Sequence, residues 1–162
     1  TVAGDVPAVR LGRPLLARRA KSADAAGRAS IDTLRALLDG AAARRVGGAT
    51  VVGAVVTDAD HRGSRAAELY ESVQLSLPDL DPATQVIRVG ESCGDLGAAR
   101  AVAPIALAHT ALHFAEPDAT ATLAVLMQDG HERVVVPLSR PRSDGPGDGP
   151  AADQPTPVSN AA

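Results

Sequence analysis

One short segment of the sequence gathers a thiol, a hydroxyl, carboxylates and several glycines, and chemistry is most expected there. It reads Gly90-Glu91-Ser92-Cys93-Gly94-Asp95-Leu96-Gly97. Cys93 comes just before a predicted helix, whose positive dipole end favours the thiolate form of a nucleophile; a small, partly buried filler is the alternative. Asp95 is a candidate catalytic carboxylate, although a carboxylate ahead of a helix most often serves only as its N-cap.

The rest of this segment is a candidate for binding a substrate. Glu91 and Ser92 line the same predicted turn. The glycines allow the backbone to approach an acyl or phosphopantetheine group closely, but they equally allow two helices to touch. These positions are Gly90, Gly94 and Gly97.

Histidines supply the remaining candidates. His61 follows a predicted central strand, at the end where the ligand sites of α/β sheets gather, and is the candidate catalytic base. A solvated loop histidine is the alternative. His109 and His113 share one face of a predicted helix at a spacing that suits a metal. Because no third ligand accompanies them, packing or hydrogen bonding is favoured and no metal site is expected.

Hydrophobic periodicity predicts the elements that position these residues. Ser30 is expected to cap a helix with apolar residues on one face. An uncharged, valine-rich run predicts a strand buried in mid-sheet, and the last two strands are expected to form an antiparallel hairpin through Asp129-Gly130. In order, the elements are a helix from 30, a strand at 49–57, a helix at 64–73, a strand at 85–89, a helix at 96–115, and strands at 119–127 and 133–138.

The helix at 96–115 is rich in alanine and lacks a polar face, which predicts a helix buried on all sides and kinked at Pro104.

The predicted elements divide the chain into three parts. Residues 1–28 are expected to be an N-terminal connecting segment and 29–138 a single α/β domain. Residues 139–162, rich in Pro, Gly and Asp, are expected to form a disordered tail.

Composition narrows the function classes. The chain has 162 residues, of which 45% are apolar and 22% charged, which suits one soluble domain. A net charge of -3 and an aromatic content of 1% disfavour nucleic-acid binding. The longest apolar run falls short of the roughly 20 residues that span a bilayer, so no membrane contact is expected. One cysteine excludes an intramolecular disulfide and favours a reducing, cytoplasmic setting.

Two local sequences and the order of the elements resemble the C-terminal half of a thiolase-fold β-ketoacyl synthase. Asp95-Leu96-Gly97-Ala98-Ala99 after Gly94 is similar to the Gly-His-x-x-Gly-Ala-Ala motif that opens the buried helix of ketosynthases. Ala59-Asp60-His61-Arg62-Gly63-Ser64, with Glu68 following, resembles the family's His-Gly-Thr-Gly-Thr segment. The resemblance implies a thiolase-like half domain over 29–138, with a mixed sheet, a buried Ala-rich helix and a C-terminal β-hairpin.

The resemblance also implies an incomplete active site. In ketosynthases, two basic residues of this half, usually histidines, act on a cysteine nucleophile of the N-terminal half. Here Gly94-Asp95 stands where the second histidine is expected, and the acidic Asp95 would repel the negative charge that develops on the reacting oxygen. Decarboxylative condensation by this chain alone is therefore not expected.

Two functions remain open. The first is an acyltransferase half, degenerate or completed by an N-terminal thiolase-like half on the parent chain or on a partner subunit, within a homo- or hetero-oligomer. Its substrate would be an acyl carrier protein or coenzyme A thioester, with no bound cofactor. The second is a non-catalytic scaffold or interaction domain that keeps only the fold.

Overall fold

The computed structural model describes residues 8–22, 25, 30–43, 51–94, 96–127 and 130–141. Helices and short strands alternate along the chain. Their bounds are β1 Arg10–Leu11, β2 Leu15–Arg18, α1 Asp32–Ala43, β3 Val52–Thr57, α2 Gly63–Ser76, α3 Pro82–Gln85, β4 Val86–Arg88, α4 Val89–Cys93, the 3₁₀-helix η1 Gly97–Arg100, α5 Val102–Phe114, β5 Ala121–Leu126 and β6 Glu132–Ser139.

The strands form one mixed sheet, in the order β1-β6-β5-β3-β4, with β2 also paired to β6. Strand β3 lies in mid-sheet and runs parallel to β4 on one side and to β5 on the other. Strand β6 runs antiparallel to β5, β1 and β2. The mixed sheet, the central valine-rich strand and the antiparallel pairing of the last two strands are confirmed. Asp129, in the predicted hairpin turn, lies outside the described residues.

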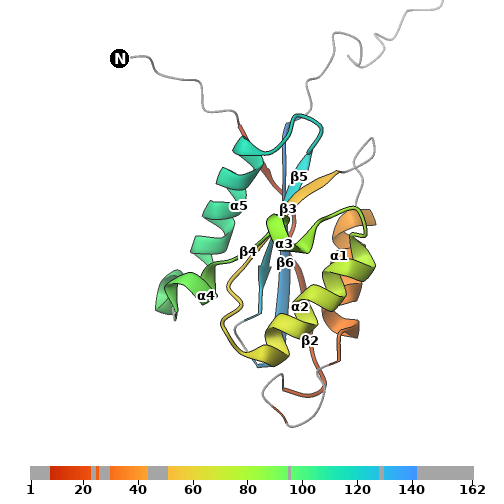
Figure 1. Cartoon of the computed structure of the whole chain (residues 1–162), viewed down its shortest axis with the longest axis vertical. Coiled ribbons are helices and arrows are strands. Elements are labelled where there is room, and N and C mark those ends of the chain that lie inside the picture. The colour runs from red at the N-terminus through yellow and green to blue at the C-terminus, as the bar shows by residue number, and fades with distance from the viewer. Residues whose placement is uncertain are drawn as a thin grey trace, which may run out of the picture.

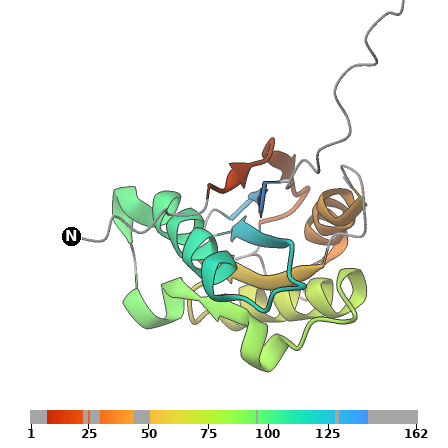
Figure 2. The same ribbon diagram turned by 90° about the horizontal axis from the view of Figure 1, so that it is seen from above.

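Helices cover the two faces of the sheet unequally (Figures 1 and 2). Helices α1 and α2 lie on one face and α5 on the other. The division follows from alternation along β3, because Val55 packs into the core under α1 and α2, whereas Val56 packs into the core under α5. The core on the α1 and α2 side is the larger of the two, and it takes in the predicted apolar face of α1. At the start of that helix, the hydroxyl of Ser30 accepts a hydrogen bond from the Asp32 N–H at 3.3 Å.

Helix α5 departs from the expectation. It begins at Val102, later than predicted, so Pro104 falls in its first turn, where the missing N–H costs nothing and causes no kink. Its buried residues are Pro104, Ala108 and Leu112. The opposite side faces solvent, with exposed fractions of 65% for Val102, 40% for Leu107 and 80% for Phe114. The prediction of a helix buried on all sides is therefore wrong for this chain by itself, because α5 rests on the sheet along one stripe only.

The N-terminal segment also departs from the expectation. Residues 10–18, predicted as part of a connecting segment, supply β1 and β2 along the outer edge of β6. Strand β6 ends at Ser139 rather than before it. The rest of the predicted tail, from residue 142, lies outside the described residues. Among the helices that the structure describes, none has the length and apolar character needed to cross a membrane.

Candidate functional site

The carboxyl ends of the parallel strands meet at one edge of the sheet, which is the usual place for ligand sites in α/β folds. The loop after β3 begins this edge, and it is buried and tightly held. The Thr57 hydroxyl accepts a hydrogen bond from the Ala59 N–H at 3.1 Å. The Asp58 carboxylate accepts one from the Met127 N–H at 2.6 Å, which ties the loop to the end of β5. The loop is therefore a rigid support for the residues that follow it.

Asp60 is the first carboxylate of this edge that approaches solvent, and two arginines neutralise it. Its Oδ1 accepts a hydrogen bond from the Arg62 N–H at 3.0 Å. Its Oδ2 pairs with the Arg65 guanidinium at 3.2 Å and with the Arg62 guanidinium at 3.3 Å. Since both guanidiniums and a backbone N–H contact it, the Asp60 carboxylate holds the start of α2 in place.

His61 is exposed between these paired charges. Within the described part of the chain, its ring has no hydrogen bond or ion pair that would orient it as a base. The structure thus places His61 at the expected edge of the sheet without the supporting contacts of a formed catalytic group.

Gly90 brings the glycine-rich segment to the same edge. A Cβ at this position would lie 2.8 Å from the carbonyl oxygen of Ala59, closer than such contacts allow, and closer still to that of Asp58. Glycine therefore lets α4 rest directly on the backbone of the loop after β3. The two sequence-predicted regions meet here through backbone, and the close approach serves packing within the fold.

The side chains of α4 point mostly to solvent. Glu91 pairs with Arg88, whose guanidinium also lies 5.4 Å from the centre of the Tyr70 ring. Ser92 and Cys93 are exposed. Cys93 is the last residue of α4 and does not begin a helix, since Gly94 and η1 separate it from α5. The expected position at a helix N-terminus is therefore wrong, and with it goes the reason for expecting a reactive thiolate.

Of the other predicted positions in this segment, Asp95 lies outside the described residues. Gly94 and Gly97 have φ angles of 70° and 51°, in the left-handed region that favours glycine. A Cβ on either would meet nothing within 4 Å. These two glycines therefore shape the turn between α4 and α5. In the part of the chain that is described, no hydrogen bond joins His61 to Cys93.

A buried ion-pair network lies at the same end of the sheet, and it was not predicted from the sequence. Glu68, on α2, accepts hydrogen bonds from Arg133 Nε at 2.9 Å and from Arg133 Nη2 at 2.8 Å. Arg19 pairs with the same carboxylate at 3.1 Å. All three residues are buried. The sequence held one usable signal, because Arg65, Glu68 and Ser72 fall on the same helical face as buried Leu69.

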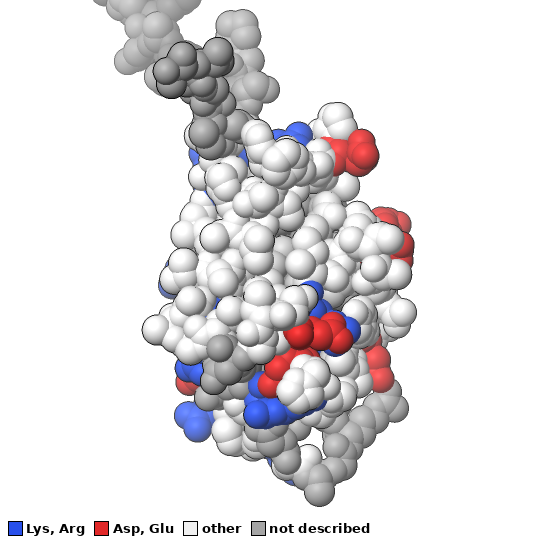
Figure 3. All heavy atoms as spheres, turned by 60° about the vertical axis from the view of Figure 1, so that its left-hand side comes forward, with Lys and Arg blue, Asp and Glu red and all other residues white. Residues whose placement is uncertain are grey.

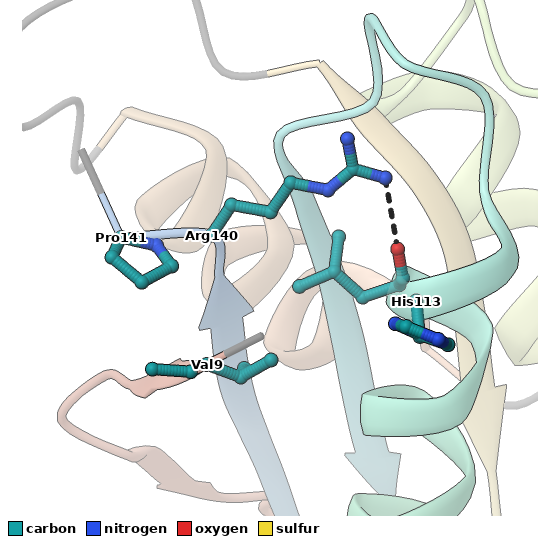
Figure 4. A pocket seen from close by; sticks show the side chains of 6 residues that line it. Val9, His113, Arg140 and Pro141 are labelled. Atoms are coloured by element: carbon teal, nitrogen blue, oxygen red, sulfur yellow. Dashed lines mark hydrogen bonds between the residues drawn. The ribbon is translucent and has the colours of Figure 1, made fainter. Parts of the chain in front are cut away.

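A hollow of about 410 Å³ lies at the opposite end of the sheet and is lined by Ala8, Val9, Leu112, His113, Arg140 and Pro141 (Figure 4). Arg140 donates hydrogen bonds to the carbonyl oxygens of Leu112 at 3.0 Å and Ala115 at 3.2 Å, so it caps the end of α5. His113 is exposed, with its ring 5.0 Å from that of Phe114. No group of three metal-ligating side chains occurs among the described residues.

The carboxyl edge is therefore an open surface of mostly paired charges carried on a rigid loop, with His61, Glu91, Ser92 and Cys93 facing outward. Comparison with known protein families, with curated proteins and with solved structures finds no match to this chain.

Proposed function

We propose that this chain is a ketosynthase-like half of a thiolase-superfamily unit, completed by an N-terminal-type half on its parent chain or on a partner subunit. The order of helices and strands, the mixed sheet and the closing hairpin support this proposal. The observation that carries it is the outward face of α5, which has no charged residue and exposes large apolar side chains.

No charged residue occurs between Arg100 and Glu116. Figure 3 shows the face over α5 as a broad area without charged side chains, with the charges gathered mostly below it. Val102, Leu107 and Phe114 are exposed there. Full burial of such a side chain stabilises an assembly by about 1.5–3 kcal/mol. Leu107 and Phe114 are seven residues apart and lie on nearly the same side of α5, so a second helix packed there would bury both.

In this proposal the reacting cysteine belongs to the partner half, and this chain contributes acyl recognition and pairing. The substrate is a thioester of an acyl carrier protein or of coenzyme A. His61 is the residue assigned to face the partner's nucleophile, because it is an exposed imidazole at the carboxyl edge and, unlike the neighbouring Arg62, does not pair with Asp60. Cys93 is not assigned the role of nucleophile, since it is exposed at the end of a single-turn helix.

The test distinguishes binding of a partner from acylation of a cysteine. The tagged chain is purified with its bound partner from the cells that make it, treated with acetyl-coenzyme A, and examined for acyl adducts by mass spectrometry. Leu107→Glu places a charge on the outward face of α5 and should release the partner. Leu75→Glu is the matched control, because Leu75 is 54% exposed on α2, on the other side of the sheet.

An acylated cysteine on a partner that the Leu107→Glu variant loses and the Leu75→Glu variant keeps supports the proposal. An adduct that forms on Cys93 and disappears in Cys93→Ala contradicts it. A partner retained by the Leu107→Glu variant also contradicts it, because the face of α5 would then be unnecessary for pairing.

The second candidate is a non-catalytic scaffold that retains the fold. The pairing of Asp60 and of Glu91 with arginines favours it, because it leaves these carboxylates engaged within the chain. A partner that depends on the face of α5 but carries no acyl adduct is the outcome that selects the scaffold.

A further inference from the structure

Residues 10–21 carry a charge opposite to that of the whole chain. They read Arg10-Leu11-Gly12-Arg13-Pro14-Leu15-Leu16-Ala17-Arg18-Arg19-Ala20-Lys21, with no carboxylate among them. The chain has a net charge of -3, with 19 acidic residues against 16 basic ones. We refer to residues 10–21 as the basic edge, because they lie along the free side of β6.

One arginine of the basic edge anchors it and the other cations remain available. The Arg19 N–H donates to the carbonyl oxygen of His131 at 2.8 Å, and its guanidinium turns inward to Glu68. Arg18 points the other way, as neighbouring strand residues do. Among the residues that the structure describes, no ion pair involves the exposed cations, which are Arg10, Arg13, Arg18 and Lys21.

These cations are spread along a line and interleaved with apolar side chains. The edge runs beside the whole of β6, whose 8 residues span about 26 Å at the usual rise of a strand. Leu11 is 57% exposed and Leu16 is 66% exposed. The surface therefore combines positive charge with apolar contact area over the length of an extended peptide of similar size.

We propose that the basic edge is a docking surface for an acidic polypeptide segment that carries apolar side chains between its carboxylates. The cations attract the carboxylates and the two leucines offer apolar contacts, while the Arg19–Glu68 pair keeps the edge in place before binding. A nucleic acid would use the charge but not the leucines, and the basic edge has no aromatic ring on which a base could stack.

Binding through side chains fits this edge better than addition of a strand. Pro14 has no N–H to offer a new strand, and the Gly12 N–H is already bonded to the carbonyl oxygen of Pro137 at 2.8 Å. Charged residues and proline on an edge strand also guard a protein against aggregation. The experiment must therefore distinguish docking from protection of the edge.

The full chain is titrated against a fluorescein-labelled peptide of glutamate and leucine, about 12 residues long, with fluorescence anisotropy as the readout. A lysine and leucine peptide of the same length tests the sign of the charge, and oligothymidine of equal charge tests the other class of polyanion. The double variant Arg13→Gln/Arg18→Gln removes two cations from the basic edge. Its matched control is Arg35→Gln/Arg100→Gln, which removes two exposed cations elsewhere.

The proposal predicts binding of the acidic peptide only, weakened about tenfold by Arg13→Gln/Arg18→Gln and less than twofold by the control. The single substitution Leu16→Ser should also weaken binding of the acidic peptide, because it removes an exposed apolar contact from the basic edge. Equal effects of the two double variants, or tighter binding of oligothymidine than of the peptide, would overturn the proposal. Self-association of the Arg13→Gln/Arg18→Gln variant with unchanged peptide binding would show instead that the cations only protect the edge.

Discussion

Replacing Glu68 with glutamine removes the one negative charge that two buried guanidiniums share. Glutamine keeps the shape of the side chain and one acceptor oxygen, so no cavity forms. Arg133 would keep one of its two hydrogen bonds to residue 68, at 2.8 Å and 2.9 Å in the native protein. Arg19 would lose its ion pair of 3.1 Å. The cost therefore comes mainly from leaving positive charge buried without compensation.

Removing one partner of a buried ion pair costs about 3–5 kcal/mol, and here the carboxylate serves two partners. A domain of ordinary stability has about 5–15 kcal/mol in all. For a chain of this size, each kcal/mol lowers the melting temperature by about 2–4 °C. We expect Glu68→Gln to lower it by about 10 °C. The hydrogen bonds of Arg133 and Arg19 to backbone carbonyls do not replace the lost charge.

Thermal and urea unfolding at neutral pH, followed by far-ultraviolet circular dichroism, measure the loss. Glu116→Gln is the control, because Glu116 is exposed and its replacement should change the unfolding free energy by less than about 0.5 kcal/mol. Replacing Glu68 by Leu together with Arg19→Met and Arg133→Met should recover most of the stability, since no buried charge remains. If Glu68→Gln unfolds as the Glu116→Gln variant does, the explanation by uncompensated charge is wrong.

Two further predictions concern the edges of the fold. Gly90→Ala should lower the unfolding free energy by about 1–3 kcal/mol, because its Cβ would collide with the Ala59 carbonyl oxygen, whereas Gly63→Ala, with nothing within 4 Å of its Cβ, should not. The Thr84 hydroxyl and a backbone N–H donate to the Asp81 carboxylate and hold its pKa below the ordinary value. These hydrogen bonds therefore stabilise the folded state at neutral pH, and that stabilisation is lost as the pH falls through the lowered pKa. Thr84→Val should raise the pKa of Asp81 in a carboxyl NMR titration, and an unchanged titration would count against that hydrogen bond.

Most of the local structure could be predicted from the sequence, because local signals determine it. The leucine spacing after Ser30 indicates α1, and the uncharged valine run indicates β3 in mid-sheet. The strands β1 and β2 have no such signal. Their partner, β6, comes from the far end of the chain, and two to four residues are too few to show alternation. Pairing over that separation is decided by tertiary structure alone.

The environment of α5 shows a second limit of prediction from the sequence. A helix without charged residues can be buried inside one chain or can lie at the surface of that chain, and its sequence does not distinguish the two cases. The sequence therefore indicates the helix but not that Leu107 and Phe114 are exposed in this chain. At the candidate site, the position of His61 after β3 was predictable from strand order. The pairing of Asp60 with Arg65 was not, because it depends on the turn by which α2 begins.

The two ends of the described core lie beside one another. Ala8 and Pro141 line the same hollow, and Arg10 faces Ser139 across the ladder of β1 and β6. A polypeptide whose entry and exit points are adjacent can be spliced into a loop of a host protein with little distortion of either. It can also be circularly permuted, with a short linker joining these ends and new termini opened at the exposed Pro78–Asp79 turn. The adjacency of the two ends therefore makes both rearrangements geometrically possible.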